Sequence, residues 1–148
     1  MPTQAQKKLL KRWFREILEQ GNLKTVKHLI DPCVVFYGQG NDPGVSGRRS
    51  FIVWLQRYRM MFSNQVWMIQ DIIGEDEKIV VRYSGYATYS GGISEIDSAH
   101  QRVFESGVFI FKLANGRVQE IWSEKSDLKT MQQLGAFPSM HELGAITV

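Results

Sequence analysis

The chain carries a strand, an Asn-Gly turn, a second strand and a short amphipathic helix in succession between residues 107 and 136. Asn115 and Gly116 suit a two-residue β-hairpin, because both residue types tolerate a positive φ. Side chains alternate between the two faces of a strand. This hairpin predicts that the second half of the chain forms an antiparallel sheet. One face of the strand before the turn carries Val103, Glu105, Gly107, Phe109 and Phe111.

Helical patterns occupy the first half of the chain. Apolar residues recur every three or four positions over residues 9–18, which predicts an amphipathic helix that Gly21 ends. Asn22 is a good N-cap for a second short helix, which stops before the Asp-Pro pair at residues 31–32. A third helix is predicted over about residues 48–62. Three helices therefore precede most of the predicted sheet.

The predicted strands complete an α+β fold. Residues 33–37, 65–73 and 78–89 are rich in β-branched and aromatic side chains, which is typical of strands. A last short helix is expected at residues 127–134. This order predicts a cone-shaped, curved antiparallel sheet packed against three N-terminal helices, with a short C-terminal helix. Such a cone encloses an apolar cavity of the kind that ordinarily binds ligands.

The length and composition are those of one globular domain. We expect a single domain over residues 1–148, with a core of about residues 6–136 and a loose tail at residues 137–148. Hydrophobic residues make up 43% of the chain, which is enough for a real core and excludes intrinsic disorder. Much of the basic excess behind the net charge of +3 lies in the first helix, where it indicates a solvated face rather than a nucleic-acid surface.

The cysteine content indicates a compartment. Cys33 is the single cysteine, so no intramolecular disulfide can form, which fits the reducing cytoplasm. Its place at the start of an apolar strand predicts a buried structural thiol. The first residues mix charges with apolar side chains, unlike a signal peptide, and no apolar run approaches the length of about 18 residues that spans a membrane. We therefore expect no membrane partner and no nucleic-acid partner.

Four short segments follow one another in the order and at the distances of a known family. They are Gly47-Arg48 before the third helix, residues 80–89, the hairpin of residues 115–122, and Gln-Gln-Leu-Gly-Ala at residues 132–136. Together they resemble the SnoaL-like polyketide cyclases of the nuclear-transport-factor-2-like superfamily. The resemblance implies a nuclear-transport-factor-2-like, or cystatin-like, fold, whose members include cyclases, isomerases, dehydratases, hydrolases and binding proteins.

The resemblance fails where the cyclases keep their acid–base chemistry. In that family a His on the strand before the hairpin and an Asp just after its second strand face the cavity. Aligning the turns places these positions at Phe109 and Ser123, and Tyr89 stands where the family often has another His. Phenylalanine has no ionisable proton, and a serine hydroxyl needs a neighbouring base. A shift of two or three residues would instead bring Asp127 near the position of the acid.

Glu105 is the preferred replacement for the missing carboxylate. It shares a face with Phe109 and Phe111, and desolvation in an aromatic pocket suits a general acid or base near neutral pH. A β-bulge would instead turn Phe104 inward and Glu105 into water, and the sequence leaves both arrangements open. His100, at the end of the preceding loop, either hangs over the cavity mouth or lies in solvent.

Aromatic residues from several elements predict the type of ligand. Their rings suit a flat or polycyclic apolar molecule that phenol hydroxyls orient, although a plain aromatic core must account for part of the set. Tyr37, Tyr89 and Ser123 would polarise an oxygen of the substrate. The catalytic candidates are Glu105, Tyr89, Ser123 and His100. The predicted substrate-binding residues are Tyr37, Trp54, Tyr58, Tyr83, Phe109 and Phe111.

We therefore expect an enzyme that acts on a small apolar or polyketide-like molecule by acid–base chemistry, as a cyclase, isomerase or dehydratase. No cofactor and no metal are expected, because the chain lacks HxH, HExxH and cysteine-cluster motifs. The alternatives are a non-catalytic binder of apolar ligands and a module whose sheet face binds a partner protein. Trp122 alternates onto that opposite face, which favours a homodimer. An epoxide hydrolase of the limonene type is disfavoured, since no inward Asp pair is evident and Arg82 has the wrong strand parity.

Overall fold

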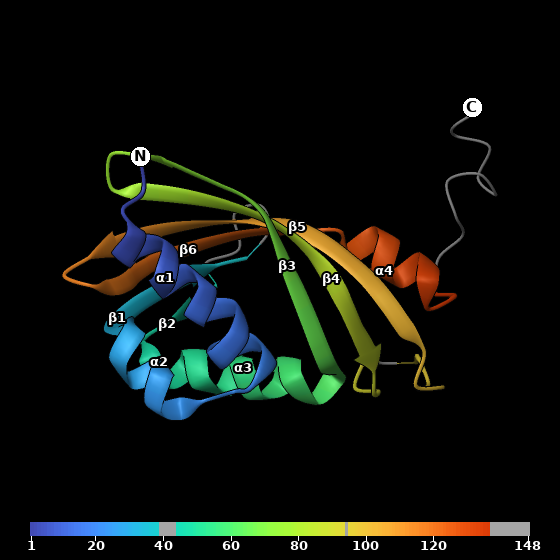
Figure 1. Cartoon of the computed structure of the whole chain (residues 1–148). Helices are drawn as coiled ribbons and strands as arrows, with labels where there is room; N and C mark the ends of the chain where they lie inside the picture. The colour runs from blue at the N-terminus through green and yellow to red at the C-terminus, as the bar shows by residue number, and fades with distance from the viewer. Residues whose placement is uncertain (39–43, 94, 137–148) are drawn as a thin grey trace.

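The computed structural model describes residues 1–38, 44–93 and 95–136, which form helices and a six-stranded sheet (Figure 1). The helical segments are α1 (Gln4–Arg12), the π-helical η1 (Trp13–Glu19), α2 (Leu23–Leu29), α3 (Arg48–Met61) and α4 (Asp127–Gln133). The strands are β1 (Ile30–Tyr37), β2 (Val45–Ser46), β3 (Phe62–Glu75), β4 (Lys78–Tyr89), β5 (Arg102–Ala114) and β6 (Arg117–Lys125). Their order in the sheet is β2-β1-β6-β5-β4-β3.

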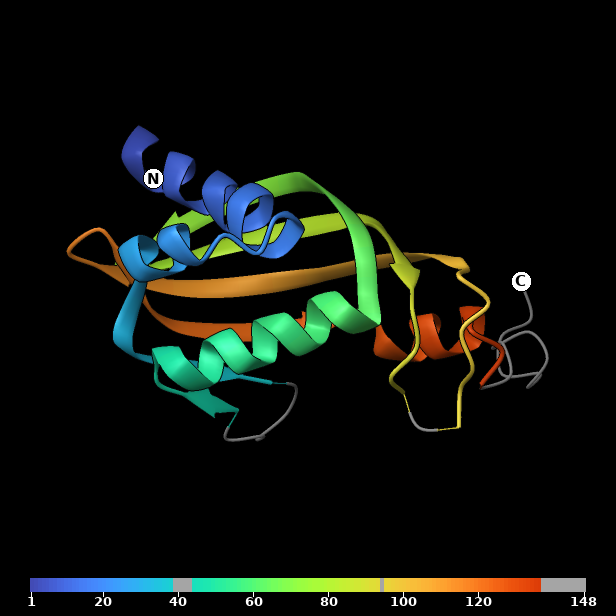
Figure 2. The ribbon, with the colours of Figure 1, turned by 90° about the horizontal axis from the view of Figure 1, so that it is seen from below.

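The helices form one layer and the curved sheet forms the other. α1, η1, α2 and α3 lie on the same side of the sheet, whereas α4 lies at its far end beside β5 (Figure 1, Figure 2). β1 pairs in parallel with β6, and all other neighbours in the sheet pair antiparallel. The predicted α+β fold, with a curved sheet against N-terminal helices, is confirmed. The parallel pair was not predicted, because it joins segments that are far apart in the chain.

Local sequence explains where the first two helices begin. Thr3 caps α1 with a capping box, in which its hydroxyl accepts the Gln6 N–H and the Gln6 side chain accepts the Thr3 N–H. Asn22 caps α2 as predicted, by accepting two backbone N–H groups of the first turn. Gly21 separates the two segments with a φ of +65°, which glycine adopts without strain. Because of this capping box, the first helix begins at Gln4, earlier than the predicted start at residue 9.

The Asn-Gly hairpin and the strand before it adopt the predicted geometry. Asn115 and Gly116 have positive φ values of +53° and +73° and connect β5 to β6. β5 pairs with β4 without a register shift, so its side chains alternate strictly. Phe104 therefore packs on the outer face against Tyr86, and Glu105 points toward α3 with 3% of its surface exposed. The arrangement in which a bulge turns Phe104 inward does not occur.

Aromatic rings fill the space between the helix layer and the sheet. The indole of Trp13 in η1 packs edge-on against Phe109 and Phe111 of β5, with ring centroids 5.5 and 5.4 Å apart. It also contacts the ring of Phe51 in α3 at 5.6 Å. Because edge-to-face packing is directional, these rings hold η1, α3 and β5 in one arrangement. Phe111 is fully buried in this core and lines neither of the ligand-sized cavities described below.

Cys33 is exposed, so the prediction of a buried thiol is wrong. The Asp31 carboxylate accepts the Cys33 N–H at 2.8 Å, which forms a tight local turn. The register between β1 and β6 shifts in the same stretch, between Ile30 and Val35. This irregularity turns the thiol away from the core, and Val34 takes the buried position.

β2 is a short edge strand that pairs with β1 and was not predicted. The tail predicted at residues 137–148 lies outside the described residues. In the described ranges, no helix combines the length and the apolar character that crossing a membrane requires.

Candidate functional site

Two adjoining cavities open between α3, the sheet and the start of α4. Their volumes are about 330 and 410 Å³, within the range of small-molecule sites. Trp54, Tyr58, Lys125 and Asp127 line both of them. We call the first the serine cavity and the second the glutamate cavity. The serine cavity is also lined by Phe36, Tyr83, Phe109 and Ser123, and the glutamate cavity by Arg57, Phe62, Ile93, Glu105 and Met131.

Glu105 is the only acidic side chain of the described ranges that is buried. The hydroxyl of Tyr58 donates a hydrogen bond of 2.8 Å to its Oε2 atom. Such charge-assisted bonds are short and strong, so this bond holds the carboxylate at the wall of the glutamate cavity. Within the described residues, this is the one hydrogen bond to the carboxylate, and it leaves the Oε1 atom without a protein donor.

The position of α3 brings Tyr58 to Glu105. Trp54 and Tyr58 lie four residues apart and share one helical face, as predicted, with their rings stacked at 5.4 Å. Arg48, the first residue of α3, donates two hydrogen bonds of 2.9 and 2.7 Å to the carbonyl oxygen of Ile30. These bonds tie the start of the helix to β1 and so set the place of the phenol over the sheet.

Tyr83 presents a second phenol to the site. It lies on β4 directly opposite Gly107, and its ring stacks on Phe109 with centroids 4.8 Å apart. A Cβ atom at Gly107 would approach the Tyr83 oxygen to 2.9 Å, so the absence of a side chain there makes room for this hydroxyl. The Tyr83 side chain is 2% exposed, lines the serine cavity and has no hydrogen-bond partner for its hydroxyl within the described residues. That hydroxyl is available to a ligand.

The surroundings of both phenols favour the neutral form. Burial, followed by the nearby Glu105 carboxylate, raises the pKa of the Tyr58 phenol well above its usual value. The same two causes, in the same order, raise the pKa of Tyr83. A neutral phenol can donate a hydrogen bond, as Tyr58 does to the Glu105 carboxylate, and Tyr83 has the same capacity at the wall of the serine cavity.

Phe109 and Ser123 are cross-strand partners on β5 and β6. Both are buried and both line the serine cavity. They are the positions at which the family resemblance places a His and an Asp. The two positions therefore meet at the cavity wall, but they carry a ring and a hydroxyl instead of an acid–base pair.

Lys125 lines both cavities, although the residues predicted from the sequence did not include it. Its Nζ atom lies 4.5 Å from the centroid of the Tyr58 ring and 4.0 Å from Oδ1 of Asp127. The Lys125 side chain is 22% exposed, whereas that of Asp127 is 57% exposed. Lys125 follows Ser123 by two positions, so strand alternation was the signal that would have placed it on the cavity face.

Tyr89 and His100, two of the predicted catalytic residues, lie at the ends of the connection between β4 and β5 and line neither cavity. Tyr89 is buried, but its hydroxyl donates to the carbonyl oxygen of Ile96 at 2.6 Å and accepts the N–H of Ile93 at 3.1 Å. Its hydroxyl therefore holds this connection. His100 is exposed. The structure does not bring either side chain together with Glu105.

Tyr37, a predicted substrate-binding residue, lies on the outer face of the sheet. Its ring stacks on Trp122 at 5.2 Å, and its hydroxyl donates to Glu120 at 3.3 Å. Alternation along β1 turns the preceding residue, Phe36, inward, and Phe36 lines the serine cavity in its place. Trp122 is on the face opposite to Ser123, as the strand pattern predicts.

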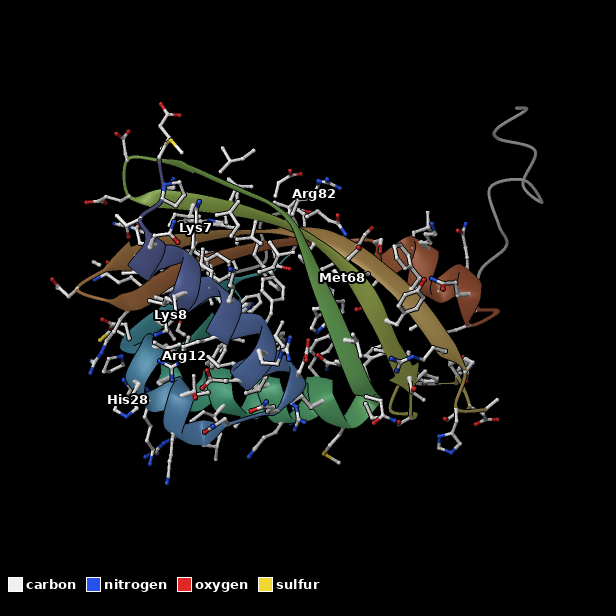
Figure 3. The ribbon with its side chains drawn as sticks, in the orientation of Figure 1. Lys7, Lys8, Arg12, His28, Met68 and Arg82 are labelled. Atoms are coloured by element: carbon white, nitrogen blue, oxygen red, sulfur yellow. The ribbon has the colours of Figure 1, made fainter. Side chains whose placement is uncertain are left out.

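The site provides groups for proton transfer. Among the residues that the structure describes, no group of three or more His, Cys, Asp or Glu side chains is placed to hold a metal ion. His28, one of the three histidines of the chain, lines neither cavity. It lies on α2, at the end of the molecule opposite to α4 (Figure 3). The cavities instead combine a buried carboxylate, two neutral phenols, a serine hydroxyl and an ammonium group. These groups can accept or donate protons, and they can stabilise negative charge.

The fold is shared with several solved structures. A candidate SnoaL-like polyketide cyclase from Jannaschia sp. CCS1 superposes with a TM-score of 0.80 at 20% identity, over 90% of this chain and 94% of that one. A candidate polyketide cyclase from Acidithiobacillus ferrooxidans has a TM-score of 0.80 at 22% identity, over 91% and 96%. IdmH from Streptomyces antibioticus, another candidate polyketide cyclase, has a TM-score of 0.76 at 20% identity, over 90% and 99%. Identities this low show a common fold.

The family follows from the sequence itself. Among curated proteins, no sequence matches this chain significantly. The family model described as SnoaL-like polyketide cyclase, however, matches residues 8–134. That span contains every strand of the described structure and all the residues that line the two cavities. The chain therefore belongs to the SnoaL-like polyketide cyclase family.

Proposed function

We propose that this protein is a cofactor-free acid–base enzyme acting on a small apolar, polyketide-like molecule, with Glu105 as the proton carrier. The observation that carries the proposal is the 2.8 Å hydrogen bond from Tyr58 to the buried Glu105 carboxylate beside a cavity. Desolvating a carboxylate is unfavourable, so a buried one next to a cavity is a natural candidate for a working acid or base.

The reaction class follows from these groups. The Glu105 carboxylate takes a proton from a carbon next to a substrate carbonyl, and the electron pair of that C–H bond moves to the carbonyl oxygen. In a cyclase, the resulting enolate carbon attacks a second carbonyl of the same molecule, the π electron pair of that C=O bond moves to its oxygen, and this oxygen takes the proton from Glu105. In an isomerase, Glu105 returns the proton to a different carbon. In a dehydratase, the enolate expels a hydroxyl group, which leaves as water with the proton from Glu105.

Tyr83 and Ser123 are the proposed donors to the enolate oxygen. Both line the serine cavity, and the Tyr83 hydroxyl has no other partner within the described residues. Preorganised donors in a site with little water stabilise developing negative charge better than water does. They take the polarising role that the sequence assigned to Tyr37 and Tyr89, whose hydroxyls bind other protein groups.

Deuterium exchange tests the role of Glu105 without knowledge of the natural substrate. The protein is incubated in D₂O with an apolar ketone such as 2-tetralone or anthrone, and the loss of the α-proton signal is followed by NMR. We expect the wild-type protein to accelerate exchange. Glu105→Gln should lower the exchange rate by about 10²- to 10⁴-fold relative to the wild-type protein. Glu124→Gln, at an exposed position of β6, is the matched control and should keep the rate. An unchanged rate in Glu105→Gln would overturn the proposal.

A non-catalytic binder is the second candidate. It is favoured by Phe109 and Ser123, because these two residues line the cavity at the positions where the family resemblance places an acid–base pair. The cavity is therefore present without that pair. Extraction of the purified protein, followed by mass spectrometry, tests this candidate. An apolar molecule that copurifies unchanged, together with no exchange on any ketone, would support the binder over the enzyme.

We also infer that the protein forms a homodimer through the outer face of the sheet. Val66, Met68 and Tyr86 expose 51%, 47% and 45% of their surfaces on this side. Met68 and Arg82 mark the neighbouring strands β3 and β4 in Figure 3. Exposed apolar side chains that cluster in this way support an interaction surface, and a second copy of the chain covers such a surface symmetrically.

A further inference from the structure

We propose that Lys125 is a substrate-binding residue, and that the substrate carries an ionised acid group, such as a carboxylate, attached to its apolar body. This inference rests on the proposed function, because it places the ligand in the two cavities beside Glu105. It is carried by the position of Lys125 and by the arrangement of charge around the cavities.

Lys125 is built into the cavity wall. It is the last residue of β6, and its side chain is only 22% exposed. Its Nζ atom lies 4.5 Å from the centroid of the Tyr58 ring, which holds the ammonium by a cation–π contact. The charge is therefore kept beside the ring that lines both cavities. An anionic group on a ligand in either cavity is within reach of it.

The other charged groups favour one orientation of the ligand. Glu105 is 3% exposed at the cavity wall, whereas Arg57 and Asp127 lie toward solvent. Water screens the charge of Asp127 more than the charges of the buried groups. A ligand acid group is repelled by Glu105 and attracted by Lys125 and Arg57, so it stays at the opening while the apolar body enters the cavities.

Tyr58 sets the spacing between the two ends of such a ligand. Its hydroxyl binds Glu105, and its ring lies beside the Lys125 ammonium. The acid group and the reacting carbon of the substrate therefore lie at two sides of one phenol. This spacing fits an aromatic or cyclic acid whose reacting carbon is a few bonds from the ionised group.

Two fluorescent probes with the same ring system separate charge from shape. One is 1-anilinonaphthalene-8-sulfonate, which carries a sulfonate, and the other is its uncharged parent, N-phenyl-1-naphthylamine. We expect the wild-type protein to bind the anionic probe about tenfold more tightly, the scale of one charge-assisted contact. Lys125→Met should remove this preference and leave the affinity for the uncharged probe unchanged. Lys125→Arg should retain the preference.

Lys129→Met is the matched control. Lys129 also lies over an aromatic ring, 5.4 Å from the centroid of Phe104, but on the outer face of the sheet. In the wild-type protein, NMR amide shifts caused by both probes should centre on Tyr58 and Lys125. Amide shifts confined to the outer face would overturn the inference. So would a Lys125→Met variant that loses affinity for both probes equally, or one that retains the preference for the anionic probe.

The failure of this inference is distinguishable from the failure of the acid–base function. Glu105→Gln should keep or strengthen the preference for the anionic probe, because it removes a repelling charge. If Glu105→Gln leaves proton exchange unchanged while Lys125→Met loses the preference, the acid–base function fails and the anion site stands. If Glu105→Gln abolishes proton exchange while Lys125→Met keeps the preference, the anion site fails and the acid–base function stands.

Discussion

Tyr58 and Tyr83 are the residues whose ionisation the fold changes most clearly. Burial, and then the Glu105 carboxylate, raises the pKa of each phenol. A raised pKa means that the folded state favours the neutral phenol. The resulting stability is fully present below the usual tyrosine pKa of about 10 and is lost as the pH rises above it.

We predict that tyrosine ionisation stays incomplete until the protein unfolds in alkali. Near-ultraviolet absorbance reports ionisation, and circular dichroism measured on the same samples reports the fold. Tyr58→Phe and Tyr83→Phe should each remove one phenol from the late step that accompanies unfolding. Ionisation of all five tyrosines near pH 10 with the fold intact would contradict the prediction.

At the scale of the elements, Arg59 of α3 holds the junction between η1 and α2. Its guanidinium donates to the carbonyl oxygens of Leu18 at 3.1 Å and Glu19 at 3.0 Å, at the end of η1. Gly21 completes the junction, because a Cβ atom there would come within 2.5 Å of Nη1 of Arg59. A cation at a helix C-terminus both satisfies free carbonyls and complements the helix dipole.

We predict that Arg59→Met lowers the free energy of unfolding by about 1.5–3 kcal/mol, the scale of hydrogen bonds made by a charged group. Arg57→Met, at an exposed position of the same helix, is the control and should change it by less than about 0.5 kcal/mol. Urea unfolding followed by circular dichroism compares the two variants. Equal effects of the two substitutions would show that the bonds of Arg59 do not stabilise the junction.

At the scale of the whole molecule, α1, η1, α2 and α3 cover one face of the sheet and leave the outer face to solvent (Figure 1). That face combines the exposed side chains of Val66, Met68 and Tyr86. Burying them against a second copy removes apolar surface from water without disturbing the cavities on the inner face.

We predict that light scattering during gel filtration gives twice the mass of a single chain. Met68→Glu places a charge within the apolar surface and should shift the protein to a monomer. Met60→Glu is the matched control, because Met60 is 76% exposed on α3 and lies away from the sheet. A monomeric wild-type protein would refute the homodimer and favour a different partner protein for this face.

The sequence by itself determined the order of the elements and the facing of most side chains. Turn chemistry identified the hairpin at Asn115 and Gly116, and capping chemistry identified the start of α2 at Asn22. Helical spacing placed Tyr58 on the inner face. Alternation along β5 placed Glu105 there only if no bulge interrupts the strand, and the unshifted pairing of β5 with β4 in the structure excludes that bulge. These features are local, because they depend on residues that are within a few positions of one another.

Only the tertiary structure decided which polar groups meet. The hydrogen bond from Tyr58 to Glu105 joins residues 47 positions apart, and the place of Lys125 beside the same ring depends on how α3 packs on the sheet. Tyr89 is buried and points inward, but its hydroxyl donates a hydrogen bond to the carbonyl oxygen of Ile96, in the connection between β4 and β5. Cys33 is exposed because a register shift interrupts β1. Such contacts depend on the packing of distant segments, which no local pattern of residues encodes.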